Sequence, residues 1–149
     1  MTKIDFYVLP DDGSLPIEVA IGRLAEKASA RGHQVFIQTE NEQQTHQLDE
    51  ALWTFRPSSF LPHSLATDAS LEQVIIGHQD PPMACSDVII NVTRSIPGCF
   101  SRFGRMAEIV THDEAAIAAS RDAWRFYRDR GYPLAKHELR AAETGRKAV

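Results

Sequence analysis

Several residue types and patterns that define common protein classes are scarce in, or missing from, this chain of 149 residues. It holds two cysteines, Cys85 and Cys99, which are isolated rather than arranged as a CxxC pair or a disulfide framework. We therefore expect a protein of the reducing cytoplasm, with a chance disulfide left open. The apolar runs are too short to span a bilayer, and the first residues lack the basic and long apolar segments of a signal peptide. The length fits one domain, and we expect no membrane partner.

Glycine-rich phosphate loops are also missing. The first expected strand-to-helix turn, Leu9–Pro16, contains one glycine and two carboxylates, which would repel a phosphate. Neither GxGxxG nor GxxxxGK[ST] occurs in the chain. This excludes a dinucleotide or P-loop site in its usual place and leaves, as an alternative, an enzyme that binds a nucleotide at an atypical site.

Recognisable catalytic and metal-binding patterns are lacking too. The six histidines are dispersed, without HxxxH or HExxH spacing, and no serine lies in a GxSxG elbow. Asp11 and Asp12 could bind a cation, but they are explained more simply as turn residues. We therefore predict no catalytic residues, no metal site and no cofactor.

Positive charge is scarce over most of the chain, although the net charge is only −4. Residues 1–120 hold 8 Lys/Arg against 16 Asp/Glu, whereas residues 121–149 hold 8 against 4. An acidic body is a poor general binder of nucleic acid, so we expect DNA to be contacted only indirectly. A direct DNA binder that uses the basic C-terminal end is a second alternative, and a merely solubilising end is a third.

The hydrophobic pattern alternates between the periods of strands and helices. Lys3–Leu9 and Gln34–Gln38 read as strands that flank an amphipathic helix, and Thr39 with Glu42 has the capping-box spacing that opens a second helix ending near Trp53. Further short strands are expected at Val74–Ile76, Val88–Val92 and Ala107–Val110. These elements predict a single α/β domain of the doubly wound type, with a mostly parallel sheet flanked by helices and a closing C-terminal helix. We place its end at residue 135 and expect residues 136–149 to be a flexible tail.

The closing helix is expected within Asp113–Tyr132 and has two contrasting faces. Ala116, Ile117, Ser120, Ala123 and Tyr127 recur at helical spacing and can face a core. Arg121, Trp124, Arg125 and Arg128 share another face, where guanidiniums can hold carboxylates around an apolar indole. This arrangement suits an acidic partner with an apolar end group, whereas the alternative is a solvated helix whose arginines are neutralised by Asp122 and Asp129.

Aromatic residues gather in a second stretch, Leu48–Leu65. Trp53, Phe60 and Leu61 lie there beside Pro57 and Pro62, so the segment cannot be one continuous helix. Such aromatics either close the edge of the sheet or anchor a protein partner.

Three motifs in these stretches resemble a known family. LDEALW at Leu48–Trp53, SFLPH at Ser59–His63 and R-x-x-W-R-x-Y-R-x-x-G-Y at Arg121–Tyr132 resemble the chi subunit of bacterial DNA polymerase III holoenzyme. The resemblance covers roughly residues 3–135, and the first two motifs are its most specific part. It implies a Rossmann-like domain without catalytic activity of its own.

The resemblance also implies partners. Chi subunits belong to the clamp-loader part of the replicase in DNA replication, and bind the psi subunit, which tethers them to the clamp loader. They also bind the acidic, Phe-ended C-terminal tail of single-stranded DNA-binding protein. Some members pair instead with a helicase-like repair protein through an overlapping surface.

By the same resemblance, particular residues are expected to make these contacts. The tail-binding residues fall on Arg121, Trp124 and Arg125, to which the shared helix face adds Arg128, with Gly131 and Tyr132 closing the helix. Trp124 and Arg125 stand where relatives commonly have Tyr and Lys, which keeps an aromatic plate and a cation. The surface for psi or the helicase-like partner falls on Trp53, Phe60, Leu61, Pro62 and His63.

Overall fold

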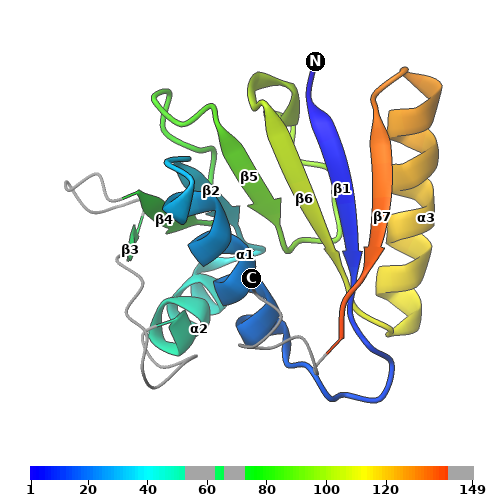
Figure 1. Ribbon diagram of the computed structural model, residues 1–149, viewed down its shortest axis with the longest axis horizontal. Coiled ribbons are helices and arrows are strands. Elements are labelled where there is room, and N and C mark those ends of the chain that lie inside the picture. Colours follow the sequence, from blue (N-terminus) through cyan, green and yellow to red (C-terminus); the bar gives the residue numbers. More distant parts are fainter. Residues whose placement is uncertain (53–62, 66–72, 141–149) are drawn as a thin grey trace.

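The computed structural model describes residues 1–52, 63–65 and 73–140, with the side chain of His63 left out. The chain runs through seven strands and three α-helices in these ranges, with a short 3₁₀ turn before β6 (Figure 1). In order, the elements are β1 Lys3–Val8, α1 Ile17–Ala30, β2 Val35–Gln38, α2 Glu42–Leu52, β3 His63–Leu65, β4 Val74–Gly77, β5 Val88–Asn91, the 3₁₀ turn Phe100–Arg102, β6 Arg105–Val110, α3 Glu114–Asp129 and β7 Leu134–Glu138.

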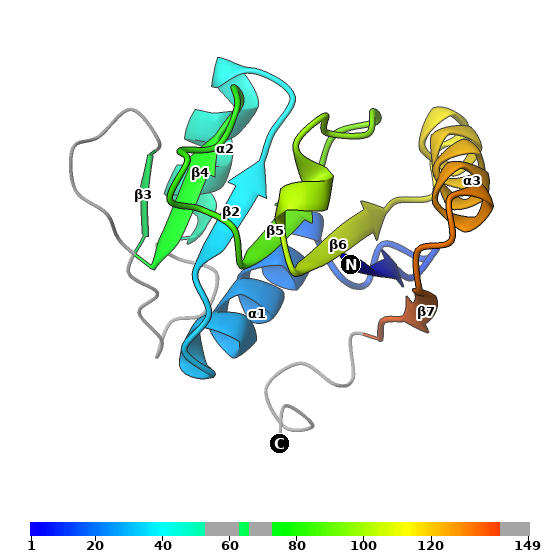
Figure 2. The ribbon, with the colours of Figure 1, turned by 90° about the horizontal axis from the view of Figure 1, so that it is seen from above.

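The strands form one sheet in the order β3-β4-β2-β5-β6-β1-β7, and every pairing in it is parallel. Figure 2 shows α1 and α3 on opposite sides of this sheet, which is the doubly wound arrangement. The predicted fold class is therefore confirmed, and the predicted mostly parallel sheet is entirely parallel over the described residues.

Each face of the sheet carries its own apolar core. On one face, α1 and α2 pack over β2, β4 and β5, with Ile21, Ala25 and Leu52 among the buried residues. On the other face, α3 packs over β1 and β6, where Tyr127 meets Phe6 and Met106. Successive residues of a strand point to opposite faces of the sheet. Phe6 of β1 therefore belongs to one core, and Leu9, just after β1, belongs to the other.

The helix ends are set by side chains close to them. The N-cap of α3 is Asp113, which accepts a hydrogen bond from the Ala116 amide at 3.2 Å. For α2 the predicted capping box is wrong, because Asn41 accepts from the Gln44 amide at 2.8 Å. Thr39 is buried at the end of β2, where its hydroxyl contacts Thr45 instead.

Two strands are additions to the elements expected from the sequence. β3 is three residues long, and β7 is a polar strand that pairs with β1 at the edge of the sheet. The expected domain boundary at residue 135 falls inside β7, which continues to Glu138.

Candidate functional site

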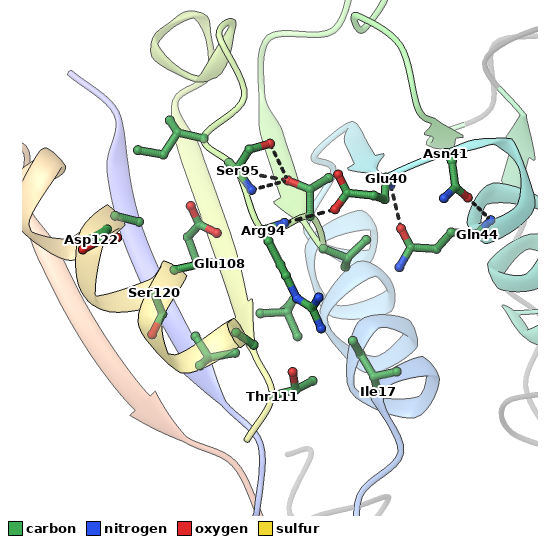
Figure 3. Close-up of a pocket in the computed structure, with 18 of the residues that line it drawn as sticks. Ile17, Glu40, Asn41, Gln44, Arg94, Ser95, Glu108, Thr111, Ser120 and Asp122 are labelled. Atoms are coloured by element: carbon green, nitrogen blue, oxygen red, sulfur yellow. Dashed lines mark hydrogen bonds between the residues drawn. The ribbon is translucent and has the colours of Figure 1, made fainter. Parts of the chain in front are cut away.

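A crevice opens at the carboxyl ends of β2, β5 and β6, between α2 and α3 (Figure 3). Its volume is about 860 Å³, and it occupies the position where doubly wound sheets commonly bind ligands. Its walls mix polar side chains of the β2–α2 and β5–β6 loops with the apolar flank of α3, which includes Ala119, Ala123 and Phe126.

The buried acid of this crevice is Glu108 on β6. Tyr127 donates its hydroxyl to one carboxylate oxygen at 2.6 Å, and the Asn91 amide donates to the other at 2.9 Å. Burial raises the pKa of Glu108 to about 7, against the opposing effect of these two hydrogen bonds. Glu108 is therefore poised to exchange a proton near neutral pH, and it connects β5, β6 and α3 at one point.

Among the residues that the structure describes, the rim of the crevice offers no free cation for a phosphate. Arg94 pairs with Asp113 at 2.7 Å, and its backbone amide donates to Glu40 at 3.3 Å. Glu40 and Asp122 add negative charge around it. The crevice thus suits a nucleotide poorly, in line with the acidic, glycine-poor loop that follows β1.

A second surface, which we call the α3 face, consists of Arg121, Trp124, Arg125 and Arg128. The structure places all four on α3, as predicted, but Trp124 differs from its neighbours because it is half-buried. Its ring lies 5.1 Å from that of Phe6, and it packs against the core beneath α3. The indole is therefore held in place by the fold, and the three exposed arginines surround it.

The arginines of the α3 face differ in their local partners. Arg125 pairs with Asp122 one turn earlier, and Arg128 pairs with Asp129 at 3.1 Å. Arg121 forms no ion pair with any residue in the described ranges. Since exposed pairs within a helix contribute little to stability, Arg125 and Arg128 can exchange their partners for another carboxylate at small cost.

Gly131 and Tyr132 end α3 in a Schellman motif. The Tyr132 amide donates to the Tyr127 carbonyl at 3.1 Å, and the Gly131 amide donates to Arg128 at 3.0 Å. Gly131 has φ of 81°, a conformation that glycine adopts without strain. Tyr132 packs edge-on against Phe100 with ring centroids 5.1 Å apart, so both residues fix the end of the α3 face.

The second predicted surface lies largely outside the described residues. Trp53, Phe60, Leu61 and Pro62 are not described, and His63 is placed only as the first residue of β3. Over the described part of the chain, no three His, Cys, Asp or Glu side chains come together so that they could hold a metal ion. No helix in that part is long and apolar enough to cross a bilayer.

Glu108 and its donor Asn91 were not predicted from sequence, whereas its other donor, Tyr127, was predicted only as a core-facing residue of the closing helix. The only sequence signal of Glu108 is a carboxylate among the apolar residues of Met106–Val110, and neither periodicity nor composition shows whether that carboxylate is buried or exposed. The parallel register, which sets Asn91 beside Glu108, supplies the missing information.

Comparison with known proteins assigns the chain to a family. A family model described as DNA polymerase III chi subunit, HolC, matches residues 1–135. A curated relative from Pseudomonas aeruginosa, named DNA polymerase III subunit chi, is 45% identical over 140 residues, which is 93% of this chain and 98% of the relative. Proteins of the same name from Haemophilus influenzae and Escherichia coli are 28% and 27% identical, over 90% of this chain and 95% and 96% of their own lengths.

These names denote an accessory subunit of the polymerase rather than its catalytic one. The family resemblance read from the three motifs is confirmed: the chain belongs to the family of DNA polymerase III chi subunits.

Proposed function

We propose that this chain is a non-catalytic accessory subunit of the DNA polymerase III clamp-loader complex, which it links to the acidic C-terminal tail of single-stranded DNA-binding protein. The observation that carries the proposal is the α3 face, where Trp124 is fixed against Phe6 beside Arg121, which pairs with no acid among the described residues. A tail that ends in Phe brings side-chain carboxylates and a terminal carboxylate to the arginines, and its ring packs against the indole.

The energetics of this surface favour weak binding. The arginines are exposed, and each exposed charge pair contributes roughly 0–1 kcal/mol, so the contact between the Phe ring and Trp124 carries much of the affinity. We expect a dissociation constant in the micromolar range, or about −8 kcal/mol. Weak sites suffice where one DNA strand presents many copies of the tail.

Fluorescence anisotropy with a labelled peptide from the tail of the same organism's single-stranded DNA-binding protein tests this site. We expect Arg121→Glu and Arg125→Glu to weaken binding by roughly tenfold or more, because each reverses a charge facing the peptide carboxylates. Raising the salt concentration should weaken the wild-type interaction as well.

The matched control is Arg94→Glu, which makes the same charge change at the rim of the crevice. Equal loss in Arg94→Glu and Arg121→Glu would mean that only net charge matters, and would move the site away from the α3 face. A peptide that fails to bind the wild-type protein at low salt would refute the tail-binding function.

The second contact we propose is with the psi subunit, or with a helicase-like repair protein, through Trp53, Phe60, Leu61, Pro62 and His63. This part of the proposal rests on the motifs LDEALW and SFLPH of the family resemblance. Trp53→Ala with Phe60→Ala should abolish co-purification with psi while leaving binding of the tail peptide intact. Undiminished co-purification of the double variant would overturn the assignment.

A further inference from the structure

A third surface, the α1 groove, lies between α1 and the strands β6, β1 and β7. In Figure 2, α1 lies beneath the β2 and β5 part of the sheet, away from the edge that β1 and β7 form. The groove has a volume of about 300 Å³. Its charged and aromatic lining consists of Lys3, Asp5, Tyr7, Lys27, Arg31, His33, Arg105 and His137.

The floor of the groove is held together by one buried carboxylate. Asp5 contacts Lys3 at 3.0 Å, Arg105 at 2.9 Å and His137 at 2.9 Å, and its side chain is only 4% exposed. Burial by itself would raise the pKa of Asp5, but the hydrogen bonds from His137, Arg105 and Lys3 outweigh it and lower that pKa. One carboxylate thus fixes Lys3, Arg105 and the His137 ring, and all three side chains remain partly exposed to solvent.

The wall of the groove adds two more cationic side chains. Lys27 lies in the last turn of α1, and Arg31 follows the end of the helix one turn later. Both are exposed, and neither pairs with an acid in the described ranges. His33, which also lines the groove, contacts Asp87 at 3.0 Å. The groove therefore gathers Lys3, Lys27, Arg31 and Arg105 around Asp5, the one carboxylate among its described lining residues.

A flat aromatic pair lies among these cations. The rings of Tyr7 on β1 and His137 on β7 are stacked, with centroids 4.7 Å apart and planes 18° from parallel. Cations that follow a phosphate backbone, combined with rings on which bases stack, are the recurring components of single-strand binding surfaces. An acidic peptide without aromatic residues would use the cations alone, whereas the Phe-ended tail could use both, so the tail peptide is assayed alongside the oligonucleotide.

From this combination we propose that the α1 groove binds single-stranded nucleic acid directly, with Lys27, Arg31 and Arg105 on its phosphates and the His137 ring beneath a base. The groove is too small for a duplex, whose bases are in any case stacked on each other. The site lies on the opposite face of the sheet from α3, so this inference does not depend on the proposed tail-binding function.

Anisotropy of a labelled oligothymidylate at low salt, titrated with the full chain, tests the proposal. We expect measurable binding that Lys27→Glu with Arg31→Glu weakens by roughly tenfold or more, because each reversed charge removes a phosphate contact. Arg94→Glu with Arg130→Glu, the latter at the C-terminal end of α3, changes the net charge equally outside the groove and should retain binding. Both Lys27 and Arg31 are exposed, and circular dichroism verifies that the variant is folded.

The aromatic contact has its own test. His137→Ala should weaken oligothymidylate binding, whereas His137→Phe, which keeps a ring for stacking, should restore most of it. Inorganic pyrophosphate should compete poorly, because it offers phosphates without a base.

Four outcomes would overturn the proposal. The first two are that the oligonucleotide does not bind at low salt, and that the groove variant and its charge-matched control lose equal affinity for it. The third is that a duplex competes for the groove as well as the single strand does. The fourth is that the groove variant loses binding of the acidic tail peptide and keeps binding of the oligonucleotide. The last would make the groove a peptide site. Because the α3 variants are assayed with the peptide and the groove variants with the oligonucleotide, either function can fail while the other stands.

Discussion

At the scale of single residues, Glu108 illustrates how a fold changes the chemistry of an ordinary side chain. Its carboxylate accepts two hydrogen bonds in the interior, yet burial dominates and raises its pKa to about 7. In the unfolded chain the same group has a pKa of about 4.5. Between these two values the folded protein holds a proton that the unfolded chain has released, so rising pH favours unfolding through this residue.

We predict that Glu108→Gln removes this pH dependence. The amide imitates the protonated acid, so the variant should gain stability relative to the wild type as pH rises from 5 to 8. A shift of about 2.5 pKa units corresponds to a relative gain of up to about 3 kcal/mol. Urea denaturation of both proteins at the two pH values measures it, and a stability difference that is the same at both would contradict the raised pKa.

The residues of the α3 face were predictable from sequence, whereas their energetic roles were not. Helical spacing alone brings Arg121, Trp124 and Arg125 together. Trp124 packs against Phe6 of β1, which lies more than a hundred residues earlier in the chain. A local sequence pattern cannot predict such a contact. The hydrogen bonds of Glu108 could not be predicted from sequence for the same reason, because its partners lie on other elements.

At the scale of secondary structure elements, β7 closes the edge of the sheet beside β1. The Ile4 amide donates to Pro133 at 3.0 Å and the Leu139 amide donates to Val8 at 2.9 Å, so the ladder extends along the whole of β1. Its side chains add the contacts of His137 with Asp5 and Tyr7. Sequence patterns predicted the apolar central strands but not β7, because an exposed edge strand has little need of apolar residues.

We predict that β7 is required for stability. A chain that ends after Pro133 should lose on the order of 3 to 5 kcal/mol, since several ladder hydrogen bonds at about 1 kcal/mol each and the packing of Leu134 disappear. It should also aggregate more readily, because β1 becomes an uncovered edge.

Thermal unfolding and light scattering compare this truncation with a chain that ends after Arg140, which keeps β7 and serves as the control. Equal melting temperatures would show that β1 does not depend on β7.

At the scale of the whole molecule, charge counted along the sequence differs from charge arranged in space. Residues 1–120 carry twice as many acids as bases, which argued against any direct contact with nucleic acid. The fold nevertheless brings Lys3, Lys27, Arg31 and Arg105 from that acidic portion to one groove. The α3 face and the α1 groove lie on opposite faces of one sheet, so the two proposed contacts do not compete for space.

The position of β1 between β6 and β7 has a consequence for synthesis on the ribosome. Lys3 pairs with Arg105 and Ile4 with Leu134, so β1 leaves the exit tunnel roughly a hundred residues before either neighbouring strand. Until then the nascent chain carries an apolar strand, with Ile4 and Phe6, that has nothing to pair with. Loop closure over such separations is slow, and we infer that the unfinished chain depends on protection during translation.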